Sequence, residues 1–202
     1  MKKSIVYILV LLVVSTTLLF GCGGEKVTAE KNTTVGFFDW VTYDSPEELT
    51  SAADIIIEGV VTNTKTGVLS KKKYDFPETL SKADKDKALT SPESNLVETI
   101  SEVKVLKVIK GDIKEGSKIS INQIGGETET EKIIIDGVKY FNKGESHFFF
   151  IKNINGIYST LNPEQGDILY EGDTILSNPS NPLFREKTTE KIRTEIKSKM
   201  KK

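Results

Sequence analysis

The pattern of apolar and polar residues over much of this chain has the two-residue period of β-strands. In residues 96–110, the odd-numbered positions from Val97 to Val105 are apolar or small, so they are expected to share one face of a strand. Leu106 and Val108 continue the apolar pattern in the opposite phase. That change of phase predicts a β-bulge near Val105–Leu106.

Further short apolar runs are separated by glycine, asparagine and proline turns, which is typical of additional strands. The expected strands are residues 55–61, 117–124, 133–135, 138–141, 147–151, 157–161, 168–170 and 174–176. Gly59 indicates a bulge or bend within the first of these. The run 147–151 is the most apolar outside the N-terminus and is expected to be a central strand. Asp136-Gly137 and Asn155-Gly156 are hairpin turn signals.

Two segments have helical patterns. Ser45-Pro46-Glu47-Glu48 supplies an N-cap, a proline for the first turn and the glutamate of a capping box, so a short helix is expected to end near Asp54. Near the C-terminus, Ile192, Ile196 and Met200 lie one turn apart. This narrow stripe predicts a C-terminal helix on the surface of the domain, or one that is partly frayed.

Short strands with glycine turns and two helices predict an all-β fold, mainly antiparallel, with a short N-terminal helix and a C-terminal helix. Residues 71–95 interrupt this pattern. They are rich in Lys, Asp, Glu and Ser and contain two prolines. We expect them to form a surface insertion in the domain.

The first 25 residues have the pattern of a secretion signal. Lys2 and Lys3 precede an apolar run from Ile5 to Phe20, which is shorter than the 20 or so residues of a membrane-spanning helix. The run ends at Cys22, the only cysteine of the chain, so this residue cannot form an internal disulfide. The alternative is an ordinary signal peptide or an uncleaved anchor in which the cysteine is incidental.

Leu19-Phe20-Gly21-Cys22 resembles the lipobox of bacterial lipoproteins. The resemblance implies cleavage after residue 21 and diacylglycerol on the sulfur of Cys22. Two acyl chains bind a membrane stably, whereas one binds marginally. We therefore expect a signal peptide at 1–21, a lipidated cysteine and flexible tether at 22–36, and a location on the outer face of the cell membrane.

The segments ADIIIEGVV, VKVLKVIKGD, GSKISI, GESHFFFI and LNPEQG follow one another in the chain. Their order resembles exported bacterial domains with an open OB-like barrel, distantly similar to netrin-like and metalloproteinase-inhibitor modules. The resemblance covers about residues 50–176 and implies a β-barrel, and we expect the whole domain to span residues 37–182. Inhibitors of that similar fold chelate a protease's zinc through a free N-terminal cysteine. A lipidated Cys22 lacks that group, so inhibition is not expected here.

The charges of the chain are unevenly distributed. Without residues 1–21 it has 26 basic and 29 acidic residues, and residues 185–202 hold eight of the basic ones and three glutamates. The remaining body is acidic, which argues against nucleic acid as a partner. The basic C-terminal helix, 183–202, is either a solvated helix end or a contact for anionic lipid or wall polymers.

Catalytic signatures are sparse. His147, the only histidine, is either a general base or metal ligand, or a polar residue at a strand end. The nucleophile-elbow, P-loop, zincin and EF-hand motifs do not occur in the sequence, and we expect no metal or cofactor. A pair of carboxylates could still hydrolyse a glycan. Candidates for such a pair are Glu58, Asp167, Glu171 and Asp173.

Phe37, Phe38, Trp40 and Tyr43 form an aromatic cluster soon after the tether. They are a candidate interaction surface on which a ligand could stack, or they pack against the edge of the sheet. We therefore expect a membrane-anchored, extracytoplasmic binding or interaction module that is not an enzyme. The alternatives are a cell-envelope hydrolase that uses a carboxylate pair and a purely structural envelope protein.

Overall fold

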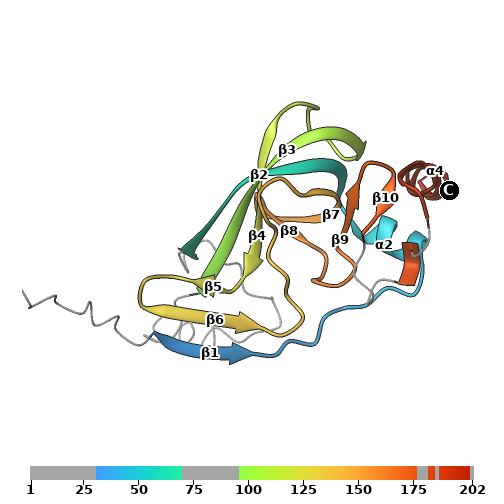
Figure 1. Ribbon diagram of the computed structural model, residues 1–202. Coiled ribbons are helices and arrows are strands. Elements are labelled where there is room, and N and C mark those ends of the chain that lie inside the picture. The colour runs from blue at the N-terminus through green and yellow to red at the C-terminus, as the bar shows by residue number, and fades with distance from the viewer. Residues whose placement is uncertain (1–30, 70–95, 177–181, 185–186, 201–202) are drawn as a thin grey trace, which may run out of the picture. The chain divides into compact units, whose positions relative to one another are not determined.

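Two β-sheets and two α-helices make up the described part of the protein (Figure 1). The computed structural model describes residues 31–69, 96–176, 182–184 and 187–200. The strands are β1 (Asn32–Gly36), β2 (Ile55–Leu69), β3 (Leu96–Lys110), β4 (Lys118–Ile124), β5 (Gly126–Glu127), β6 (Glu131–Ile135), β7 (Ser146–Ile154), β8 (Ile157–Thr160), β9 (Asp167–Glu171) and β10 (Thr174–Ile175). The helices are α2 (Pro46–Ala52), a 3₁₀ helix (Pro182–Phe184) and α4 (Thr189–Lys199). The expected leader, Cys22 and the insertion 71–95 lie outside the described residues.

The larger sheet has the strand order β10-β9-β7-β2-β3-β4-β8, and β8 also pairs with β7. The sheet therefore curls until β8 lies between β4 and β7. Its pairings are antiparallel except for β4–β8, which is parallel. The predicted all-β fold with two helices is confirmed. The sheet is mixed and is not a fully closed barrel, because β9 and β10 continue it beyond β7.

The predicted bulge of β3 is confirmed. Val105 pairs with Gly59 and Lys107 pairs with Glu58, so Leu106 is the extra residue, and its side chain is 47% exposed. The odd-numbered residues from Val97 to Val105 are all buried, as the alternation predicts. Because one unpaired residue shifts the two-residue period, Val108 packs against the same core cluster as Val103 and Val105, although it lies in the opposite sequence phase.

Residues 55–59 of β2 and 147–151 of β7 are buried on both faces of the sheet, which explains the continuous apolar runs there. Phe148 and Phe150 of β7 pack with α2 and α4 in one core cluster. Phe149 and Ile151 point the other way and pack in a second cluster inside the curl of the sheet. The expected central position of the 147–151 strand is therefore confirmed, with β9 and β2 on its two sides and β8 paired to its later part.

The C-terminal helix is an integral part of the first core. Ile192 and Ile196 are fully buried, and α4 contacts α2 (Figure 1). Arg193 binds the buried carboxylate of Glu58 with two hydrogen bonds, Nε to Oε1 and Nη2 to Oε2, each 2.7 Å. Such a bidentate pair is among the stronger ionic contacts in proteins and fixes the helix against the sheet.

A second, smaller sheet has the order β1-β6-β5. Here β1 runs parallel to β6 from Asn32↔Glu131 to Gly36↔Ile135. The last five residues of the segment expected to be a tether therefore form a strand, which the local sequence did not indicate. The predicted hairpin between 133–135 and 138–141 is wrong. Both edges of β6 are occupied, by β1 and β5, and residues 138–141 form no strand.

Candidate functional site

A pocket of about 460 Å³ lies among β3, β4, the β7–β8 hairpin, residues 161–163 and residues 39–43. Its lining is mainly apolar and includes Ile154, Ile157 and Leu161. Polar and charged side chains also line it, among them Glu98 and Asn122 from neighbouring strands. A mainly apolar surface with polar groups at fixed positions is typical of small-molecule sites.

Residues 39–43 form a strap that makes one wall of the pocket, and buried amides hold its backbone. The main-chain N–H of Tyr43 donates to Oε1 of Gln165 (2.9 Å), and Nε2 of Gln165 donates to the carbonyl of Tyr43 (2.8 Å). Nδ2 of Asn162 donates to the carbonyl of Val41 (2.8 Å). These bonds replace the strand pairing that the strap lacks.

The turn that carries these amides is shaped by the LNPEQG segment. Oδ1 of Asn162 accepts hydrogen bonds from the main-chain N–H groups of Glu164 (3.0 Å) and Gln165 (2.6 Å). This Asx-type turn directs both amide side chains toward the strap. A Cβ atom at Gly166 would lie 2.5 Å from the carbonyl oxygen of Asn162, so glycine is required by the close approach of the backbone.

The structure divides the aromatic cluster between the pocket and the surface. Trp40 and Tyr43 line the pocket, and the ring of Phe38 lies 5.4 Å from that of Trp40. Phe37 is 76% exposed and does not line the pocket. The indole Nε1 of Trp40 is buried without a hydrogen-bond partner in the described part of the chain.

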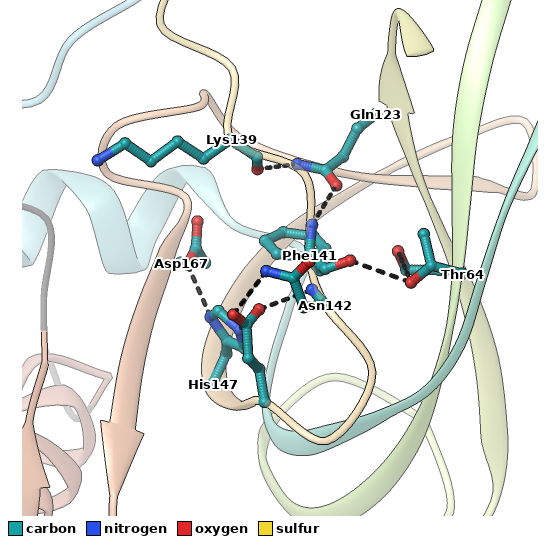
Figure 2. Close-up of polar contacts among 9 residues, drawn as sticks. Thr64, Gln123, Lys139, Phe141, Asn142, His147 and Asp167 are labelled. Atoms are coloured by element: carbon teal, nitrogen blue, oxygen red, sulfur yellow. Dashed lines mark hydrogen bonds and ion pairs between the residues drawn. The ribbon is translucent and has the colours of Figure 1, made fainter. Parts of the chain in front are cut away.

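The polar groups of the pocket were not identified from the sequence. Nδ2 of Asn122 on β4 donates to Oε2 of Glu98 on β3 (2.7 Å). Gln123, next to Asn122, is used structurally, because Nε2 donates to the carbonyl of Lys139 and Oε1 accepts from the N–H of Phe141 (Figure 2). The available sequence signal was the pair of adjacent amide residues, Asn122 and Gln123, near the end of the 117–124 strand. The partners of these amides are distant in sequence, so the pattern could not show what they bind.

His147 lies outside the pocket and is 3% exposed. Its Nδ1 is 2.8 Å from Oδ2 of Asp167 (Figure 2). Its Nε2 is 3.3 Å from Oε2 of Glu145. Its ring stacks on Phe149. Burial raises the pKa of Glu145, but hydrogen bonds from Asn142 and His147 outweigh this and leave the pKa lowered. The histidine joins the start of β7 to β9 and to the preceding turn.

The four carboxylates considered for hydrolysis do not line the pocket. Glu58 binds Arg193, Asp167 lies against His147, and Asp173 accepts a hydrogen bond from the hydroxyl of Thr189. Glu171 is exposed at the end of β9. The first three therefore have structural partners.

Several cations of the C-terminal region are also paired within the domain. Besides Arg193, Lys187 pairs with Glu195, and Lys199 pairs with Glu47 (3.3 Å). Within the residues that the structure describes, no group of three or more His, Cys, Asp or Glu side chains is placed to hold a metal ion. No helix in the described ranges has the length and hydropathy needed to cross a membrane.

Comparison with known proteins does not assign the chain to a family. No protein-family model matches this chain, and no curated protein is significantly similar to it in sequence.

Proposed function

We propose that this protein is a lipid-anchored, extracytoplasmic binding module without enzymatic activity of its own. Diacylglycerol on Cys22 would hold an OB-like domain at the outer face of the cell membrane. The domain would bind its ligand in the pocket between β3, β4, β8 and the strap 39–43. The pocket is the observation that carries this proposal.

The order of strand pairing supports an OB-like arrangement. Following the hydrogen-bonded neighbours gives β2, β3, β4, β8, β7 and then β2 again, with one parallel pair between β4 and β8. OB-like barrels are five-stranded and partly open, and they bind ligands on the face of their second and third strands. Here the second and third strands of that order are β3 and β4, which carry Glu98 and Asn122.

The construction of the pocket supports binding as its role. A volume of about 460 Å³ lies within the range of small-molecule sites. Amide hydrogen bonds hold the backbone of the strap at Val41, next to Trp40 in the chain, and at Tyr43, so this wall of the pocket is preformed. Preformed walls reduce the conformational entropy lost on binding. The structural partners of three of the four candidate hydrolytic carboxylates support binding over hydrolysis.

The anchor is tested by Cys22→Ala. We expect the wild-type chain to incorporate radiolabelled palmitate and to sediment with membranes, and the variant to lose both properties, because the sulfur is the proposed site of acylation. Ser15→Ala, a change in the leader away from the lipobox, is the matched control and should label normally. Equal labelling of the wild type and the Cys22 variant would refute the anchor.

The pocket is tested by photocrosslinking in intact cells. A photoreactive residue at Ile157, which lines the pocket, should capture a defined adduct detectable by mass spectrometry of the purified protein. The same residue at Leu106, which is exposed outside the pocket, should not capture that adduct. Identical adducts, or none, at the two positions would contradict ligand binding in the pocket.

A further inference from the structure

One carboxylate of the pocket is buried and has no cation among the residues that the structure describes. Glu98 is 8% exposed, and the amide of Asn122 is its only side-chain partner in the described part of the chain, through Oε2. The other oxygen, Oε1, has no such partner there. A neutral amide satisfies one lone pair but does not neutralise a charge. Burial of a carboxylate is costly unless it is paired with a cation.

Glu58 provides an internal comparison. It is 3% exposed, and Arg193 neutralises it through two hydrogen bonds of 2.7 Å. The carboxylate of Glu58, buried beside α4, therefore has its own cation. Glu98 is buried to a similar degree but faces a pocket. Since Glu98 has no cation among the described residues, this difference indicates that an occupant of the pocket supplies one.

The basic side chain in the pocket lining is already engaged. Nζ of Lys152 donates to Oδ1 of Asp54 (3.0 Å) and to the carbonyl of Ala52 (3.3 Å). Asp39 adds a second carboxylate to the same lining. The charged groups that line the pocket therefore leave a negative excess, which favours a positively charged ligand and disfavours an anionic one.

The other lining residues indicate the chemistry of the uncharged part of such a ligand. Ile154 and Ile157 offer apolar surface and Trp40 offers an aromatic ring, whereas the lining residues Tyr43 and Leu161 also pack against the first core cluster. Aromatic faces attract organic cations as well as apolar groups. An occupant that uses both features would have an apolar body and one charged nitrogen.

We propose that the ligand of the pocket is a small organic cation, an amine or guanidine on an apolar body, whose nitrogen donates hydrogen bonds to the carboxylate of Glu98. This inference rests on the proposed function, because it assumes that the pocket binds a ligand. It goes further by specifying the class of ligand and the residue that recognises its charge.

Trp40 is the only tryptophan of the chain and lies in the pocket wall, so its fluorescence reports on occupancy. The test titrates the full-length chain in detergent with three probes that share one apolar body: 4-phenylbutylamine, 4-phenylbutanol and 4-phenylbutyrate. Calorimetry under the same conditions provides a second measurement. We expect the amine to bind about tenfold more tightly than the alcohol, and the acid to bind most weakly.

Glu98→Gln keeps the shape of the side chain and removes its charge. We expect this variant to bind the amine and the alcohol equally, with its affinity for the alcohol unchanged. Glu164→Gln, at an exposed position outside the pocket, should behave as the wild type. The comparison of the three probes needs only the wild type, so it decides the question even if the Glu98 variant does not fold.

Two results would overturn the inference. Equal affinity of the wild type for the amine and the alcohol would show that Glu98 does not select a charge. Absence of binding by all three probes would show that the pocket does not accept this class of ligand. In both cases the crosslinking experiment at Ile157 decides separately whether the pocket binds a ligand at all, so failure of this inference is distinguishable from failure of the proposed function.

Discussion

Two buried amide side chains decide where the aromatic wall of the pocket lies. Asn162 and Gln165 come from one turn and bind the backbone of Val41 and Tyr43, more than 100 residues earlier in the chain. A buried main-chain group without a partner costs about 1–3 kcal/mol, so each of these bonds matters more to the strap than its net strength suggests. The position of Trp40 depends on them, since the strap has no strand partner.

We predict that Gln165→Ala loosens the strap. The change removes both hydrogen bonds to Tyr43, so the free energy of unfolding should fall by about 2 kcal/mol in urea denaturation. Acrylamide should quench the fluorescence of Trp40 more strongly than in the wild type. Glu164→Ala, at the exposed neighbouring position, is the control and should leave both measurements unchanged. Unaltered quenching in the Gln165 variant would contradict this account of the strap.

At the scale of elements, the bulge at Leu106, in the pairing of β3 with β2, lets these two long strands bend around the interior of the curled sheet. Bulges increase local twist and bend the strand that contains them. Gly59 lies opposite this bulge, and a Cβ atom there would be 2.4 Å from Cγ1 of Val103 and 3.1 Å from the carbonyl oxygen of Lys104. The bend therefore brings β3 close enough to require glycine.

Gly59→Ala is expected to destabilise the protein by about 1–3 kcal/mol, because the added methyl group overpacks the core beside Val103. Gly67→Ala tests the same substitution in the same strand. Its Cβ atom would meet nothing closer than Cδ1 of Ile100 at 3.9 Å, so its stability should stay within about 0.5 kcal/mol of the wild type. Urea denaturation of both variants measures the difference. Equal destabilisation would show that crowding at Gly59 is not the cause.

At the scale of the whole molecule, the pairing of β2 with β3 continues to Leu69↔Leu96, so the two ends of the insertion meet as neighbours in the sheet. Two paired residues can be joined by a two-residue hairpin turn. Residues 71–95 contain few apolar side chains that could contribute to a hydrophobic core. The domain should therefore fold without the insertion.

We predict that replacing residues 70–95 with Asn-Gly leaves a cooperatively folded domain. A shorter loop also costs slightly less closure entropy, so the melting temperature should stay the same or rise slightly. Thermal denaturation followed by circular dichroism measures this, and replacement with six Gly/Ser residues controls for strain in the short turn. A broad, non-cooperative transition in both variants would contradict the prediction.

Local sequence patterns determined most of the strands. The alternation in β3, the bulge at Leu106 and the Asn155-Gly156 turn, with φ of 53° and 84°, could all be predicted. Each depends on neighbours within a few residues, because the two-residue period of side chains and the positive φ of a tight turn are local properties. The proposed acylation of Cys22 likewise rests on a local motif and still awaits its test.

The candidate site was decided by tertiary structure alone. Of the aromatic cluster, the sequence could not separate Trp40 and Tyr43, which line the pocket, from the exposed Phe37. It did not indicate that Glu98 would be buried with no cation among the described residues, while Glu58 would bind Arg193, 135 residues away. The physical reason is that solvation and pairing of a charge depend on whatever surrounds it in space, and long-range contacts bring those surroundings together only when the chain folds.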